Sequence, residues 1–153
     1  VTANFAPYLL ERAQMYMNND QARNAMLDYD AYYKAVNGQV NDLFYYYREQ
    51  AALKARQYQR ALDDIVKAVE LSPKDLTYRA EHAVVNLRVG RYEESMKILN
   101  EILKDEPKYG EAYRLLGLCQ IQLKKTDEAC GNFNKAKELG DPNVDELIKK
   151  YCK

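Results

Sequence analysis

Residues 110–142 read GEAYRLLGLCQIQLKKTDEACGNFNKAKELGDP. This segment predicts two consecutive helices. Asp141-Pro142 ends the second one, because proline cannot continue a helix and disfavours helical backbone in the residue before it. Ala129 is predicted to lie where the two helices meet, since helices approach closely only where a side chain is short. The segment is therefore predicted to be a helical hairpin.

The same features recur along the chain at a fixed interval. Pro73 and Pro107 are 34 residues apart, and so are Tyr58 and Tyr92. Three further columns keep this interval: Ala61, Ser95 and Ala129; Tyr45, Arg79 and Tyr113; Ala68, Ile102 and Ala136. Agreement among several independent columns indicates tandem copies of one structural unit.

Turn and stop residues predict the helix boundaries of each copy. In the second copy, the pattern predicts a helix over 42–54, a turn at 55–57 and a helix over 58–71, which Ser72-Pro73 ends. In the third copy, Gly90 supplies the turn and Glu106-Pro107 supplies the stop. Each copy is thus predicted to form two helices.

This pattern resembles the tetratricopeptide repeat, whose signature is W-x2-L-G-x2-Y…A-x3-F…P. The fourth copy aligns with it through Tyr113, Leu116, Gly117, Gln120, Ala129, Phe133, Ala136 and Pro142. In the second copy Arg48-Glu49 replaces Leu-Gly, in the third His82 replaces Leu, and the first copy is degenerate. The resemblance implies an all-α, right-handed solenoid of four helix-turn-helix repeats in a single domain, residues 1–153. The repeats are expected at about residues 6–41, 42–75, 76–109 and 110–142.

Residues 143–153 are predicted to form a capping helix. Asn143 can cap its first turn, and an array of repeats must cover its last apolar face. The side chains expected to do so are Val144, Leu147, Ile148 and Tyr151. This end of the chain is therefore interpreted as the true end of the array.

The first helix has a more apolar outer edge. Tyr8, Leu9 and Tyr16 contribute to it, and Asn4 is a candidate cap. Two interpretations stay open: Phe5 and the tail cover this edge, or the chain is a fragment of a longer protein with repeats upstream.

The resemblance also predicts a binding surface. In this family ligands usually bind the concave face, which is lined by the first helix of each repeat at positions 2, 5, 9, 12 and 13. Residues at such positions include Leu10, Gln14 and Leu43. The candidate partner-binding residues are Tyr46, Gln50, Leu53, Lys54, Val84, Leu87, Arg88, Arg114, Leu118 and Ile121.

Five of these candidates are expected to form an apolar strip, and the three basic ones to flank it. The strip is Leu53, Val84, Leu87, Leu118 and Ile121. An apolar groove with a basic rim suits an amphipathic or extended peptide that carries some acidic residues. The alternative is that the curvature of the array buries part of the strip between neighbouring helices.

One known binding mode of the family is not expected. Some members hold a C-terminal carboxylate with Lys at position 5 and Asn at position 9. This chain has Leu10 and Gln14, Tyr46 and Gln50, Ala80 and Val84, and Arg114 and Leu118 there. The sequence therefore predicts against a co-chaperone that binds chaperone tails.

Other conspicuous side chains are assigned structural roles. The tyrosines at 29, 32, 33 and 45–47 are expected to fill cores and interfaces, and His82 to be a semi-buried imidazole. The acidic pairs at 28/30 and 63/64 are expected on solvated outer faces. Cys119, Cys130 and Cys152 are expected to be buried free thiols, with a disulfide between two of them as the alternative.

The composition disfavours several classes of function. Lys plus Arg and Asp plus Glu both number 23, which disfavours a sequence-independent nucleic-acid ligand, and no apolar run approaches the length of a membrane span. No metal site, cofactor or catalytic group is identified. The prediction is a non-catalytic protein-interaction module in a soluble, more cytoplasmic than periplasmic, bacterial-style protein. The alternative is a self-associating scaffold, for example a homodimer through the N-terminal edge. RNA binding is weakened by the 34-residue period.

Overall fold

The computed structural model describes residues 6–153, which form nine α-helices and contain no strand. The chain divides into two compact units, one ending at Lys74 and the other beginning at Asp75. The first unit holds α1 (Ala6–Asn18), α2 (Ala22–Ala35), α3 (Asp42–Lys54) and α4 (Tyr58–Leu71). The second holds α5 (Leu76–Arg88), α6 (Tyr92–Asp105), α7 (Gly110–Gln122), α8 (Thr126–Glu138) and α9 (Asp145–Tyr151). The expected Asn4 cap and Phe5 cover lie outside the described residues.

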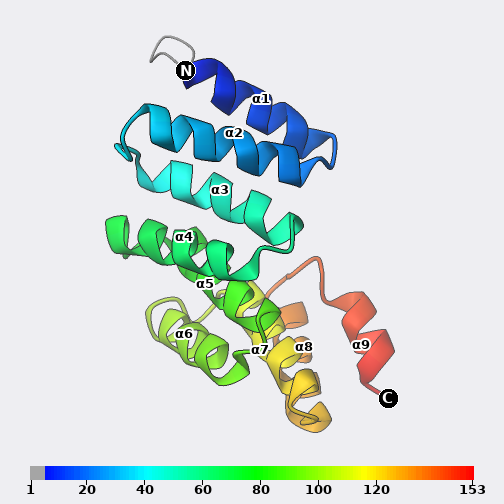
Figure 1. The fold of residues 1–153 in the computed structure, drawn as a ribbon. Helices are drawn as coiled ribbons and strands as arrows, with labels where there is room; N and C mark the ends of the chain where they lie inside the picture. Colours follow the sequence, from blue (N-terminus) through cyan, green and yellow to red (C-terminus); the bar gives the residue numbers. More distant parts are fainter. Residues whose placement is uncertain (1–5) are drawn as a thin grey trace. The chain divides into compact units, whose positions relative to one another are not determined.

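In the first unit, each helix packs on the next one along the chain (Figure 1). The predicted bounds of α3 and α4 are confirmed. The side chain of Asn41 accepts a hydrogen bond from the Phe44 N–H and caps α3. The turn to α4 places Arg56 in the left-handed region, at φ 60°. Unlike the third copy, this turn therefore reverses the chain without glycine.

The core of the first unit combines small and aromatic side chains. Ala13, Ala25, Ala51, Ala52 and Ala61 are buried. Tyr29 is buried as predicted, and its ring meets that of Phe44 edge-on at 5.8 Å. Small residues let the helices approach, and the rings fill the volume between them.

Two predicted outer-face aspartates in this unit are in fact buried. Asp28 accepts two hydrogen bonds from Arg12, at 2.7 and 2.6 Å, and is 4% exposed. Asp64 is equally buried and accepts two from Arg48, at 2.8 and 2.7 Å. The prediction of solvated carboxylates was wrong for both because it placed each helix face without considering an arginine 16 residues earlier in the hairpin partner. Asp63 is exposed, as predicted.

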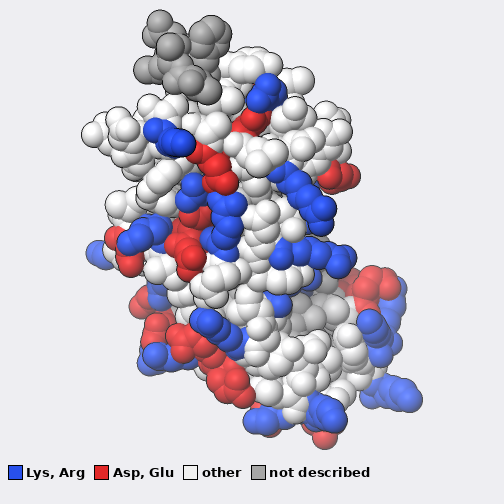
Figure 2. Space-filling model, viewed as in Figure 1, with Lys and Arg blue, Asp and Glu red and all other residues white. Residues whose placement is uncertain are grey.

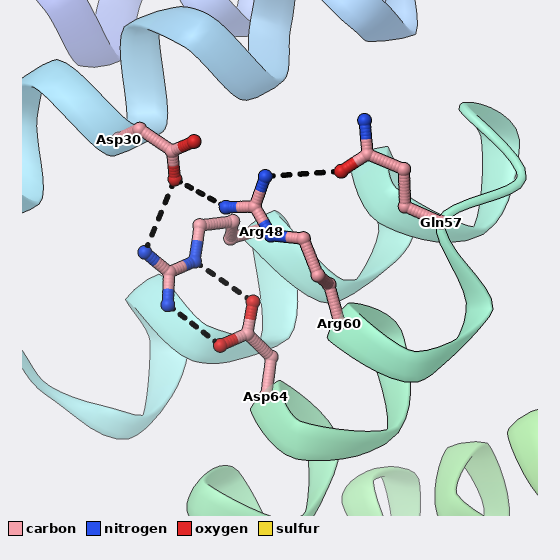
Figure 3. A network of polar contacts seen from close by, with 5 residues as sticks. All are labelled: Asp30, Arg48, Gln57, Arg60 and Asp64. Atoms are coloured by element: carbon pink, nitrogen blue, oxygen red, sulfur yellow. Dashed lines mark hydrogen bonds and ion pairs between the residues drawn. The ribbon is translucent and has the colours of Figure 1, made fainter.

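The Arg48 pair belongs to a wider polar network (Figure 3). Asp30 accepts from Arg60 and lies 3.5 Å from Nη1 of Arg48, and Arg60 also donates to Gln57. Burial lowers the pKa of Arg48, but its hydrogen bonds and the charges of Asp64 and Asp30 raise it more. The guanidinium therefore stays charged inside the unit.

The second unit has a similar two-hairpin plan with a less charged interior. Gly90 makes the α5–α6 turn at φ 82°, which confirms its predicted role. Ser95 stands where the second and fourth repeats have Ala61 and Ala129. Its buried hydroxyl donates a hydrogen bond to the Ala83 carbonyl at 2.7 Å, so this polar group has a partner. Within this unit, α5 contacts α7 as well as α6.

The C-terminal helix closes the second unit, as expected from its apolar side chains. Val144 is fully buried against a cluster that includes Phe133, and Leu147, Ile148 and Tyr151 pack on the same cluster. The predicted Asn143 cap was wrong. The backbone N–H of Asn143 donates instead to the Asp141 carboxylate, so this residue belongs to the connecting turn.

A disulfide joins this helix region to α8. Cys130 and Cys152 are bonded, with their Cα atoms 5.6 Å apart. The expectation of free thiols was therefore wrong for these two residues and right for Cys119, which is free and buried. The packing of α9 on α8 brings residues 22 positions apart into bonding distance, which the sequence spacing did not reveal.

Candidate functional site

Four of the five predicted strip residues lie in the second unit and share packing partners there. Val84, Leu87 and Leu118 are half-buried and pack on one apolar cluster, which includes Ala80 and Leu115. Leu118 also packs with Ile121 on the Phe133 cluster. These four residues, Val84, Leu87, Leu118 and Ile121, are called here the α5/α7 strip.

The charges beside this strip differ from the predicted basic rim. Arg114 is held by Asp141 at 2.9 Å and by Glu111 at 3.0 Å, so its charge is largely neutralised within the unit. Arg88 is exposed, and its charge lowers the pKa of Glu81. Burial and the charge of Glu111 nevertheless raise that pKa overall. Acidic groups therefore accompany both arginines. Glu111 occupies a groove position of the fourth repeat, but neither it nor Glu81 was among the candidate residues.

The remaining candidates lie in the first unit. Tyr46, Gln50 and Leu53 are half-buried, and Lys54 is exposed, 3.6 Å from Asp20. The ring of Tyr46 lies 5.7 Å from that of Tyr47. Tyr46, Gln50, Leu53 and Lys54 therefore all keep some accessible surface on α3.

The first unit also contains a pocket of about 470 Å³ that the candidate list did not identify. It lies between α1, α2, α3 and the loop joining α2 to α3. Its lining residues are Leu10, Gln14, Tyr29, Tyr32, Gln39, Val40, Asn41, Leu43, Phe44 and Tyr47. Leu10, Gln14 and Leu43 occupy groove positions that the repeat register assigned, so the register was a usable signal.

The pocket is aromatic and uncharged. Tyr29 and Phe44 are buried, and the Tyr32 ring stacks on Phe44 at 5.5 Å. Burial and the neighbouring Tyr47 raise the pKa of Tyr29 to about 12, so this phenol is neutral near pH 7. Leu43 and Tyr47 are 43% and 40% exposed, which leaves large apolar side chains at the pocket accessible.

Positive and negative side chains are interspersed on the face shown in Figure 2. Within residues 6–153, no cluster of three or more His, Cys, Asp and Glu side chains could hold a metal ion. None of the described helices is long and apolar enough to cross a membrane. His82 is half-buried as predicted, and burial lowers its pKa, although Glu94 opposes this shift.

Family comparisons agree with the repeat pattern. A family model described as anaphase-promoting complex, cyclosome, subunit 3 matches residues 18–102, more than half of the chain. A tetratricopeptide repeat model matches residues 81–144. The chain belongs to the tetratricopeptide repeat family. The predicted family and the all-α helical-repeat fold are confirmed.

Curated relatives of this tetratricopeptide repeat chain share part of its length. Small glutamine-rich tetratricopeptide repeat-containing protein 2 of Mycosarcoma maydis is 29% identical over 99 residues, 65% of this chain and 28% of that protein. Heat shock protein STI1 of Saccharomyces cerevisiae is 31% identical over 101 residues, 63% of this chain and 17% of that protein. The chain thus spans less than a third of the length of either relative.

Solved structures match the fold over nearly the whole chain. The tetratricopeptide repeat protein YrrB, described as having an unusual peptide-binding site, superposes with a TM-score of 0.80 and 19% identity, covering 95% of this chain and 74% of that one. MamA from Desulfovibrio magneticus RS-1 gives 0.73 and 19%, covering 88% and 75%. At this identity the likeness establishes the fold.

Proposed function

We propose that the chain is a non-catalytic interaction module that binds a peptide or helix of a partner protein through partly exposed groove positions on the first helix of each repeat. The family is in general a protein-interaction fold. YrrB, with the same fold, is described as having a peptide-binding site. The observation that carries the proposal is the α5/α7 strip, whose members are all half-buried.

The α5/α7 strip has properties expected of a docking surface. Its members keep part of their apolar area in water, and a partner that covers it would gain roughly 25 cal/mol for each Å² removed from solvent. Exposed apolar surface on folded proteins tends to mark interaction sites. Because Glu81 and Glu111 accompany Arg88 and Arg114, the proposed partner is an amphipathic segment that presents an apolar face and charges of both signs.

The test is a charge placed on the strip. A Leu87→Glu, Leu118→Glu chain, checked for helicity by circular dichroism, is compared with wild type for capture of a partner from native extract. Affinity for the captured protein, measured by calorimetry, is expected to fall by about tenfold or more because a carboxylate would be buried at the interface.

A matched control separates binding from stability. Ile98 and Leu103 are half-buried, pack on the same cluster as Val84 and lie on α6, outside the strip. An Ile98→Glu, Leu103→Glu chain should keep wild-type affinity. Equal losses in both folded variants would contradict the proposal.

Self-association is the second candidate, favoured by apolar side chains on α1. Tyr8 and Met15 are 55% and 63% exposed. They lie on one face of α1 because they are seven residues apart, which is about two helical turns. Leu9, expected on this edge, is buried, and Tyr16 is half-buried. Light scattering over a range of protein concentrations tests this function. An average molar mass that rises with concentration in wild type, but stays at the monomer value in a Tyr8→Lys, Met15→Lys chain, would support it.

A further inference from the structure

We propose that the pocket of the first unit, lined by residues of α1, α2 and α3, is a second recognition site that accepts a large uncharged side chain from an extended protein segment. The site lies outside the α5/α7 strip. It depends on the proposed function only in taking the ligand to be part of a protein.

The size and floor of the pocket define the side chain. A volume of about 470 Å³ falls in the range of small-ligand sites and has room for a leucine or phenylalanine with its adjoining backbone. Buried Tyr29 and Phe44 contribute to its wall, with Tyr32 stacked beside Phe44. An apolar or aromatic group entering here would replace water against aromatic carbon.

Charge complementarity favours a neutral occupant. None of the ten lining residues is Lys, Arg, His, Asp or Glu, and the phenol of Tyr29 keeps its proton near pH 7. A lysine or glutamate side chain entering the pocket would lose hydration without meeting an opposite charge. The Arg48 guanidinium already lies 5.1 Å from the centre of the Phe44 ring, so a second cation against this ring is disfavoured.

The polar residues of the pocket suit a peptide backbone. Gln14, Gln39 and Asn41 are exposed carboxamides among the lining residues. The Asn41 oxygen caps α3 and the Gln14 amide donates to Asn18 at 3.3 Å, so the NH₂ of Asn41 and the oxygen of Gln14 are not used in these two bonds. Such groups pair with the C=O and N–H of an extended segment.

The exposed apolar residues complete the argument. Leu43 and Tyr47, both on α3, line the pocket and are each about two-fifths exposed. Water contact with these side chains is unfavourable, and a side chain seated between them would bury part of both. The bound segment is therefore expected to lie across α3 with its large residue inserted between α1 and α3.

The experiment uses the full chain and capped tripeptides, Ac-Ala-X-Ala-NH₂, with X as Phe, Leu, Lys or Glu. Methyl NMR signals of Leu10, Val40 and Leu43 report on the pocket, and those of Leu103 report elsewhere. The Phe and Leu peptides should produce saturable shifts at the pocket methyls with Kd on the order of 1 mM. The Lys and Glu peptides should bind at least about tenfold more weakly.

Two substitutions and two matched controls test the location. Leu43→Ala and Tyr47→Ala should each weaken the Phe peptide by about fivefold. Leu71→Ala and Tyr58→Ala remove the same residue types, 56% and 39% exposed, from α4 outside the pocket, and should leave binding unchanged. Circular dichroism confirms that all four variants are folded.

Several outcomes would overturn the assignment. They are the absence of saturable shifts with the Phe and Leu peptides, tighter binding of the Lys peptide, or equal weakening by the α4 controls. Benzyl alcohol serves as a backbone-free probe, and binding as tight as that of the Phe peptide would exclude a role for the carboxamides. The Leu87→Glu, Leu118→Glu chain should bind the Phe peptide normally, so failure of this site and failure of the α5/α7 strip are distinguishable.

Discussion

The two compact units build helical hairpins with the same spacing from different interactions. In the first unit, an arginine on the first helix of each hairpin holds a buried aspartate 16 residues later: Arg12 with Asp28, and Arg48 with Asp64. The corresponding pairs in the second unit are His82 with Ile98 and Leu116 with Asn132. The shared hairpin spacing thus does not depend on one chemistry at this column.

The difference shows what the charged pairs can contribute. A buried ion pair offsets much of its attraction by the cost of removing both charges from water. Burial raises the pKa of Asp64 more than the hydrogen bonds and charge of Arg48 lower it, in the direction that this cost predicts. We therefore expect the charged pairs to specify which helices meet more than they add to stability, since the hairpins of the second unit carry other residues at these positions.

The largest expected effect comes from breaking one such pair. Arg48→Leu copies Leu116 of the fourth repeat but leaves Asp64 buried without its main cation. The free energy of unfolding should fall by about 3–5 kcal/mol. Urea unfolding followed by circular dichroism measures it.

A matched control lies in the second unit. Arg79 donates to Asp105 at 2.7 Å, but that carboxylate is 62% exposed, so Arg79→Leu should cost less than about 1 kcal/mol. The double change Arg48→Leu, Asp64→Asn should recover most of the loss by installing the neutral pair of the fourth repeat. A double variant as unstable as Arg48→Leu alone would refute the specificity argument.

The disulfide provides the next largest effect and exists only in the second unit within the described chain. Cys130→Ala with Cys152→Ala opens the loop closed between two positions that are 22 residues apart, and should lower the free energy of unfolding by about 2–4 kcal/mol. The same loss should follow addition of a dithiol reductant to wild type. Reductant should not change the variant, and a reductant effect of equal size there would place its origin elsewhere.

A third test concerns the close packing of α7 against α8 at Gly117. A Cβ added at Gly117 would lie 2.4 Å from a ring carbon of Phe133, which is fully buried. Gly117→Ala should therefore destabilise the second unit by about 1–3 kcal/mol, although alanine is the better helix former.

The third repeat suggests the compensating change. It places Ala83 opposite Leu99 at the same two positions, and both are buried. Adding Phe133→Leu to Gly117→Ala should therefore restore part of the lost stability, whereas Phe133→Leu alone should only leave a cavity. Additive losses in the double variant would show that the two sites do not share this volume.

These repeat positions show which features of the structure could be predicted from the sequence and which could not. The 34-residue period predicted the helices because proline and glycine act on the local backbone, and the inward side chains of α9 followed from helical periodicity. The buried state of Asp28 and Asp64, and the bond between Cys130 and Cys152, depend on which face of one helix meets another. The pocket was missed for the same reason, since its residues come from three helices and a loop.

The smallest expected effect is a pH dependence from His82, which occupies the Arg48 column in the third repeat. Burial lowers its pKa in the folded chain, so the unfolded chain takes up the proton first as the pH falls through its ordinary value near 6.5. The free energy of unfolding should therefore decrease from pH 7.5 toward pH 5, by less than the Gly117→Ala effect. Glu94 opposes the shift and limits its size.

His82→Leu isolates this contribution, because Leu116 holds the same position in the fourth repeat without a titrating group. Carboxylates such as Glu81 and Asp64 titrate in both proteins, so the informative quantity is the difference between the two unfolding curves at each pH. That difference should shift in favour of His82→Leu as the pH falls. A constant difference from pH 7.5 to pH 5 would mean that the imidazole has the same pKa in the folded and unfolded chains. Histidine at this position would then act in packing alone.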